Sequence, residues 1–199
     1  MSDHYVIVGL GNPGAKYAET RHNAGFWFLD LLAKRSGAVF RTQSKFHAEL
    51  VKTDLYGQHC ILAKPMTYMN HSGQAVRAIV DYYKISSDRL LIVYDELDLP
   101  PGVARLKQGG GHGGHNGLRD SFRHTLDHEF LRLRIGIGHP GHKDAVTGYV
   151  LSRPSAQQEL LTRRVISDAA EVMREVLGGE VSKAMKTLHT VTGPEQGNL

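Results

Sequence analysis

Short apolar runs rich in β-branched residues alternate along this chain with longer stretches of helical periodicity. Residues 5–10 (YVIVGL) and 90–94 (LLIVY) are too short for helices and predict buried strands. Between them, residues 22–36 predict an amphipathic helix with Phe26, Leu29 and Leu32 on one face. Because strands alternate with helices, we predict an α/β protein whose sheet is covered by helices on both faces.

The same criteria predict four more strands, at residues 46–55, 58–64, 103–107 and 131–138, and more helices, at 70–83, 116–126 and over most of 145–189. The first two of these strands flank Tyr56 and Gly57, which is a hairpin signal and makes the sheet mixed. Asn70 or Ser72 is expected to cap the helix that follows. No linker or repeat divides the chain. We predict one globular domain over residues 1–199, with a twisted mixed β-sheet and a frayed tail at 190–199.

Composition excludes several classes of protein. A single cysteine, Cys60, excludes a disulfide framework. The apolar runs are far shorter than the ~20 residues of a membrane span. Asp3 precedes the first apolar run and no basic segment comes before it, so we expect no signal peptide. We therefore expect a soluble protein of the cytoplasm.

The distribution of charge says more than its sum. The chain has 24 Lys and Arg against 20 Asp and Glu, a net charge of +4. Residues 105–143 hold seven basic and three acidic residues, so the whole excess lies in this segment. Such a local basic field attracts phosphate groups. A solvated basic face is the alternative, and charge alone leaves both open.

Polar residues follow several of the predicted strands. In open α/β sheets, ligands bind just beyond the carboxyl ends of the strands. The residues at such places are Asn12, Asn70, Asp95, His115 and Asn116, and His22 opens the first predicted helix. We expect these side chains to face one crevice.

His22 and Asp95 are the strongest candidates for catalysis. The N-terminus of a helix disfavours imidazolium, so we expect a neutral His22 ring that accepts a proton. Asp95 would accept the other ring N–H and fix the tautomer. The asparagines offer amide donors for a developing oxyanion, which the hydrolysis of an acyl bond requires. Ordinary capping and turn roles remain alternatives for each of these residues.

Nucleotide-dependent redox chemistry and nucleophilic catalysis find less support. GLGNPG (residues 9–14) matches a dinucleotide-binding fingerprint, but Pro13 lacks an N–H and Asp30 falls inside a helical pattern instead of ending a second strand. The chain has no G-x-S-x-G motif, and Cys60 lies in the middle of a predicted strand, where thiols are inert.

Metal-assisted hydrolysis is another alternative. His112 and His115 form one pair of histidines three residues apart, and His139 and His142 form a second. Neither pair has the His-x-x-x-His spacing of a helical zinc site or a carboxylate fixed beside it. The sequence therefore favours the histidine–carboxylate reading over a metal site.

Six motifs occur in a fixed order: VGLGNPG (8–14), TRHNAG (20–25), KPMTYMN (64–70), YDELDLPPG (94–102), GGGHGGHNG (109–117) and RLRIGIGHPG (132–141). Together with Tyr17, they resemble the bacterial peptidyl-tRNA hydrolases over about residues 5–189. The resemblance implies a monomeric α/β enzyme that needs no metal or cofactor. Its substrate would be peptidyl-tRNA, whose peptide or N-blocked amino acid is esterified to the terminal ribose, and hydrolysis would recycle the tRNA after abortive translation.

The resemblance also implies roles for individual residues. His22 matches the catalytic histidine and Asp95 the carboxylate that orients it. The residues matching those that bind substrate are Asn12, Tyr17, Tyr68, Met69, Asn70, Asp98, His115 and Asn116. Lys107 and Arg134 match a pair that binds the 5′ phosphate of the tRNA, and both lie in the basic segment. His71 departs from the family, which often has an apolar residue there.

The implied mechanism is direct attack of water on the ester without a covalent intermediate. His22 would act as general base, Asn70 or Asn12 would stabilise the oxyanion, and Asn116 would hold the water or the peptide backbone. The alternative is a catalytically silent RNA-binding protein of the same fold. The presence of both His22 and Asp95 argues against that alternative.

Overall fold

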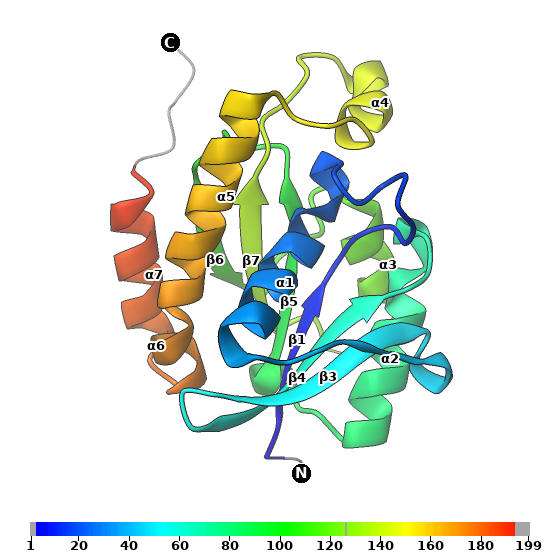
Figure 1. The fold of residues 1–199 in the computed structure, drawn as a ribbon, viewed down its shortest axis with the longest axis vertical. Coiled ribbons are helices and arrows are strands. Elements are labelled where there is room, and N and C mark those ends of the chain that lie inside the picture. Colours follow the sequence, from blue (N-terminus) through cyan, green and yellow to red (C-terminus); the bar gives the residue numbers. More distant parts are fainter. Residues whose placement is uncertain (1–2, 126, 194–199) are drawn as a thin grey trace.

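The computed structural model describes residues 3–125 and 127–193 (Figure 1). Within these residues, seven strands form one sheet in the order β2-β3-β4-β1-β5-β7-β6. The strands are β1 (Tyr5–Gly9), β2 (Arg41–Gln43), β3 (Ala48–Leu55), β4 (Gln58–Pro65), β5 (Leu90–Glu96), β6 (Ala104–Gln108) and β7 (Leu131–Gly136). Strands β4, β1, β5 and β7 are parallel, whereas β3 is antiparallel to both β2 and β4, and β6 is antiparallel to β7. The predicted mixed α/β sheet is confirmed.

Helices cover both faces of this sheet, as predicted. They are α1 (Ala24–Ser36), α2 (Ser72–Tyr83), α3 (Asn116–His124), α4 (Val146–Val150), α5 (Ala156–Glu171), α6 (Met173–Leu177) and α7 (Val181–Val191). One apolar core lies between the sheet and α1, α5, α6 and α7, and a second lies between the sheet and α2 and α3 (Figure 1). No helix among the described residues is both long and apolar enough to cross a bilayer.

The central strands are buried on both faces, which explains why they appear in the sequence as continuous apolar runs. In β1, Ile7 contributes to the core under α1, and Val8 contributes to the core under α2. In β5, Val93 contributes to the core under α1, and Ile92 contributes to the core under α2. The sheet therefore forms a rigid floor whose carboxyl edge is available for a site.

Glycine allows α1 to pack directly onto this floor. A Cβ atom added at Gly25 would lie 2.5 Å from the carbonyl oxygen of Val93 and 2.6 Å from the amide nitrogen of Leu10. No side chain fits at such a separation, so Gly25 lets the helix backbone touch both β1 and β5. This packing brings the short 3₁₀ turn η1 (Arg21–Asn23), which precedes α1, to the carboxyl end of β5.

Several predicted boundaries were wrong. Strand β5 continues to Glu96, so Asp95 belongs to the strand and not to the turn that follows. Strand β3 begins at Ala48, because Phe46 lies in the 3₁₀ turn η2 (Ser44–Phe46). The short edge strand β2 was not predicted, since its Arg-Thr-Gln sequence lacks an apolar alternation.

The ends of three helices also differ from prediction. Asn70 lies in the 3₁₀ turn η3 (Met69–His71) and Ser72 is the first residue of α2, so neither caps that helix. Helix α3 ends at His124 and not at residue 126. Of the predicted tail, residues 190 and 191 belong to α7, and residues 194–199 lie outside the described part of the chain.

Candidate active site

A cleft of about 720 Å³ opens at the carboxyl edge of the parallel strands. The structure places around it all ten residues that the sequence nominated for catalysis and substrate binding: Asn12, Tyr17, His22, Tyr68, Met69, Asn70, Asp95, Asp98, His115 and Asn116. They come from five separate segments of the chain. This is the position at which open α/β sheets bind ligands.

His22 and Asp95 form a buried pair on the floor of the cleft. Nδ1 of His22 lies 2.9 Å from each carboxylate oxygen of Asp95. The two residues are 8% and 2% exposed. Because the carboxylate only accepts hydrogen bonds, Nδ1 of His22 donates and Nε2 is left as the basic nitrogen. This geometry suits a general base.

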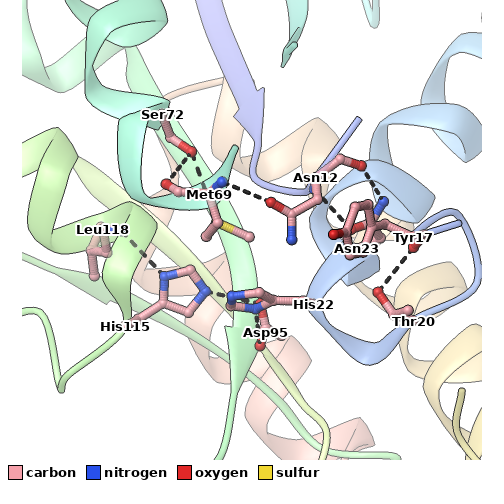
Figure 2. A network of polar contacts seen from close by, with 10 residues as sticks. All are labelled: Asn12, Tyr17, Thr20, His22, Asn23, Met69, Ser72, Asp95, His115 and Leu118. Atoms are coloured by element: carbon pink, nitrogen blue, oxygen red, sulfur yellow. Dashed lines mark hydrogen bonds and ion pairs between the residues drawn. The ribbon is translucent and has the colours of Figure 1, made fainter. Parts of the chain in front are cut away.

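Asp95 also accepts a hydrogen bond from His115, whose Nε2 lies 2.9 Å from Oδ1 (Figure 2). His115 is the N-cap of α3, and its Nδ1 accepts the backbone N–H of Leu118 at 3.2 Å. That bond places the ring proton of neutral His115 on Nε2. Two imidazoles from separate elements therefore hold one carboxylate in place.

The charges of this network shift the pKa values of both His22 and Asp95. Burial alone would lower the pKa of His22, but the charge of Asp95 and its hydrogen bond raise that pKa above the ordinary value. The sequence led us to expect a neutral ring from the helix N-terminus alone, and the structure adds the opposing influence of Asp95, which raises the pKa. Burial would favour protonated Asp95, yet His22 and His115 together hold the pKa of its carboxyl well below the usual range.

His22, Asp95 and His115 also have the residue types of a metal site. Among the described residues, they are a group whose possible ligand atoms lie within 4.8 Å of one another. A metal ligated through Nε2 of His115 would require that ring to carry its proton on Nδ1. Nδ1 already accepts the N–H of Leu118, so ligation would break the N-cap of α3. The hydrogen bonds favour a proton-transfer site.

Asn12 is oriented by two neighbours. Its side-chain Oδ1 accepts the backbone N–H of Met69 at 2.7 Å. Asn23 makes two hydrogen bonds to the Asn12 backbone: its Oδ1 accepts the N–H of Asn12 at 2.9 Å, and its Nδ2 donates to the carbonyl of Asn12 at 2.9 Å. Because Oδ1 is engaged, the Nδ2 group of Asn12 points away from the Met69 turn into the space beside His22 (Figure 2). Its N–H groups therefore face the part of the cleft beside His22 (Figure 2).

The rim of the cleft is aromatic and amide-rich. Tyr17 and Tyr68 meet edge to face with ring centroids 6.4 Å apart, and Tyr68 is 62% exposed. Asn70, Asn116 and Asp98 are exposed on the same rim. Exposed rings and amides can bind the flat and polar groups of a nucleotide or peptide.

Lys107 and Arg134 lie outside the cleft lining, on strands β6 and β7. Lys107 is paired with Arg132 in the antiparallel register, and Arg134 is two residues further along β7. The two cations therefore share one face of the sheet. Nε of Arg134 lies 3.0 Å from Oε2 of Glu96, whereas Lys107 is exposed.

The other groups that the sequence offered for alternative chemistries are buried or held in local contacts in the described part of the chain. The thiol of Cys60 is buried in β4, where burial raises its pKa to about 12. Asp30 forms an ion pair with Lys64 at 2.8 Å and does not line the cleft. His112 and His139 each accept a backbone N–H from the residue two positions later in a local turn.

Sequence reasoning missed part of the cleft. One wall is formed by α4 and the residue after it, and two cations, Arg119 and Lys143, also line the cleft. The lining residues that were missed are Glu96, Leu97, Arg119, His139, Lys143, Val146, Thr147, Val150 and Leu151. The cations belong to the basic segment 105–143, so its charge excess was a usable signal. The wall formed by α4 left no signal in the sequence, because a five-residue helix shows no clear periodicity.

Known proteins resemble this chain over nearly its whole length. The family model described as peptidyl-tRNA hydrolase matches residues 6–196. The peptidyl-tRNA hydrolase of Halorhodospira halophila is 52% identical over 184 residues, covering 92% of this chain and 95% of the relative. The peptidyl-tRNA hydrolase of Stenotrophomonas maltophilia (strain K279a) is 53% identical over 190 residues, covering 96% of this chain and 99% of the relative. The crystal structure of peptidyl-tRNA hydrolase from Acinetobacter baumannii superposes with a TM-score of 0.91 at 47% identity, covering 94% of this chain and 95% of that one. The chain therefore belongs to the peptidyl-tRNA hydrolase family.

Proposed function

We propose that this protein hydrolyses the ester bond between the terminal ribose of a tRNA and the peptide or N-blocked amino acid that it carries. The observation that carries the proposal is the buried pair of His22 and Asp95 at the floor of a cleft lined with amides. Family membership indicates the class of substrate, and the pair of His22 and Asp95 indicates general base catalysis.

His22 acts as the general base. Nε2 takes a proton from a water molecule as the water attacks the ester carbonyl, and the imidazolium that forms is stabilised by Asp95 through Nδ1. The raised pKa of His22 reflects this stabilisation. General base catalysis of this kind contributes about 10²–10⁴-fold. The leaving ribose oxygen then takes the proton back from Nε2, and no covalent acyl-enzyme forms.

Asn12 stabilises the oxyanion. Of the two asparagines that the sequence left open, Asn12 is the buried one, and its Oδ1 is fixed by Met69 so that its N–H donors face the reacting centre. Asn70 is exposed and suits substrate binding at the rim. A well-placed oxyanion donor contributes roughly 3–4 kcal/mol. Asn116, at the start of α3, holds the attacking water or the peptide backbone.

A free aminoacyl-tRNA is spared because of its charged α-amino group. Placing an ammonium in a partly closed cleft without a partner costs several kcal/mol, whereas the amide of a peptide finds hydrogen-bond partners. The tRNA end is held by charge. Lys107 and Arg134 on the adjoining face bind its 5′ phosphate. We further propose that the enzyme works as a monomer in the cytoplasm, where it recycles tRNA after abortive translation.

The test is the release of labelled peptide from peptidyl-tRNA, with aminoacyl-tRNA carrying the same amino acid as the control substrate. We expect turnover of the first and at least 100-fold slower release from the second. Binding of peptidyl-tRNA without release of peptide would instead identify a catalytically silent RNA-binding protein.

A further inference from the structure

A basic groove lies away from the active-site cleft, between the edge strands β2 and β3 and the last turn of α2. Its volume is about 310 Å³, and we call it the Lys45 groove. It is lined by Val39, Arg41, Gln43, Lys45, Phe46, Leu50, Val51, Lys52 and Tyr83. The mechanism proposed above uses none of these residues.

Three exposed cations of the groove have no carboxylate partner among the described residues: Arg41, Lys45 and Lys52. Two of them rest on aromatic rings instead. The ammonium of Lys45 lies 4.0 Å from the ring centroid of Tyr82, and that of Lys52 lies 4.8 Å from the centroid of Tyr83. Tyr82 is itself 60% exposed. The rings hold the charges in place without neutralising them.

The acidic groups nearest in sequence are engaged elsewhere. Asp54 hydrogen-bonds to His59 at 2.6 Å, and Asp81 forms an ion pair with Arg77 one turn earlier in α2. Glu49 alternates with Leu50 on β3 and so points to the opposite face of the sheet. The groove therefore presents an unbalanced positive field.

This field lies on the same face of the sheet as Lys107 and Arg134. Lys52 is paired with Ile61 and Arg134 with Tyr94, and both of these partners belong to the core under α2 and α3. Paired residues of neighbouring strands point to the same face. On this face, one group of cations thus lies at the β2–β3 margin and the other at the β7–β6 margin.

The two margins lie on opposite sides of the sheet, since the order places β4, β1 and β5 between β3 and β7. A single ligand that contacts both margins must therefore be extended and carry anionic groups along its length, as a nucleic-acid double helix does. Double-stranded RNA is recognised by its shape and its phosphates, which needs point charges on a surface and no reading of bases. Lysines on a surface margin meet this requirement.

We propose that the Lys45 groove is a second contact for the tRNA, which binds the phosphates of its double-helical body after the 5′ phosphate has docked on Lys107 and Arg134. The proposal rests on the proposed function, since it takes peptidyl-tRNA as the substrate. The body of the tRNA then lies across the α2–α3 layer, while its 3′ end enters the cleft. This second contact favours a full-length tRNA over a short acceptor fragment.

The test is the triple variant Arg41→Ala, Lys45→Ala, Lys52→Ala. It is assayed on peptidyl-tRNA and on a short hairpin with the same 3′ peptidyl ester and 5′ phosphate but only a few base pairs. For peptidyl-tRNA we expect KM to rise about tenfold with kcat unchanged. The slope of log KM against log salt should fall by about 0.9 for each lost phosphate contact. For the hairpin we expect KM to stay within twofold of wild type.

The matched control is the triple variant Lys34→Ala, Arg164→Ala, Lys186→Ala. It removes the same charge from exposed residues of α1, α5 and α7, which cover the opposite face. We expect it to leave the ratio of the two KM values at its wild-type level. Melting temperatures of all variants show that they are folded.

An unchanged KM for peptidyl-tRNA in the Lys45-groove variant would overturn the proposal and leave the groove as a site for an acidic protein. An equal rise in KM for peptidyl-tRNA and for the hairpin would also overturn it. So would the same change in the ratio of the two KM values in the control variant. Failure of the proposed function is a separate result, because the wild-type enzyme would then release no peptide.

Discussion

Asp95 is the residue on which the chemistry of the site depends. It accepts hydrogen bonds from His22 and His115, both at 2.9 Å, and neither imidazole has another carboxylate at its bonded nitrogen in the described structure. The buried negative charge raises the pKa of His22 and needs both donors for its own stability. An asparagine at this position would place a donor NH2 group against one of these imidazole N–H groups.

The change Asp95→Asn should therefore reduce kcat by at least 100-fold and change KM little. The carbonyl oxygen of an asparagine can still accept from both rings at the position of Oδ1, but its NH2 group then lies against Nδ1 of His22. That contact favours the His22 tautomer protonated on Nε2, in which the ring has lost its basic nitrogen toward the cleft. The measurement is steady-state hydrolysis of peptidyl-tRNA. Asp54→Asn, in the exposed pair of Asp54 and His59, is the matched control and should be neutral. Equal effects of the two changes would contradict the role of Asp95.

The pH dependence follows from the direction of the His22 shift. A general base works when deprotonated, so kcat/KM should fall as the pH drops through the pKa of His22, and the midpoint should lie above the ordinary value of about 6.5. A profile of kcat/KM between pH 5 and 9 measures this midpoint. A midpoint below 6 would show that burial outweighs Asp95 and that the electrostatic description of the pair is wrong.

At the scale of elements, the close approach of α1 to the sheet places His22 beside β5. Gly25→Ala would put a methyl group within 2.5 Å of the Val93 carbonyl, so the helix must move outward. We expect a loss of roughly 1–3 kcal/mol in the free energy of unfolding and a lower kcat. Denaturant unfolding measures the first effect. Gly148→Ala in α4 meets no atom within 4 Å and should be neutral or slightly stabilising.

Elements with strong periodicity could be predicted from the sequence, and elements set by tertiary contacts could not. Strands β1 and β5 and helix α1 were found because burial on both faces, or on one helical face, leaves a clear pattern. Strand β2 exists because it pairs with β3, and its own residues show no apolar alternation. The end of β5 was misplaced because Asp95 and Glu96 resemble turn residues, although β7 pairs with both.

The candidate site was predictable to a similar extent. Asp95 and the asparagines could be placed because they follow predicted strands, and His22 because it precedes a predicted helix. Their grouping around one cleft follows from the parallel sheet. The hydrogen bond from His115 to Asp95 could not be predicted, since it depends on the path of the glycine-rich segment 109–114 that leads from β6 to α3. The orientation of Asn12 by Met69 is a tertiary contact of the same kind.

At the scale of the whole molecule, the basic segment divides between the cleft rim and the face that carries Lys107 and Arg134. The double variant Lys107→Ala, Arg134→Ala should raise KM for peptidyl-tRNA and lower its dependence on salt, with little change in kcat. A peptide esterified to adenosine has no 5′ phosphate and serves as the control substrate. Its hydrolysis should be nearly unchanged, and equal damage to both substrates would assign these residues to the fold or the catalytic centre instead.

The most direct test of the proposed chemistry is the variant His22→Ala, measured for both turnover and binding. If Nε2 of His22 activates water, kcat for peptidyl-tRNA should fall by at least 100-fold, while the Kd for the same tRNA stays within threefold of wild type. The dissociation constant is measured with the variant itself, since it does not consume the substrate. Turnover within tenfold of wild type would contradict the general-base role of His22 and, with it, the mechanism proposed for this site.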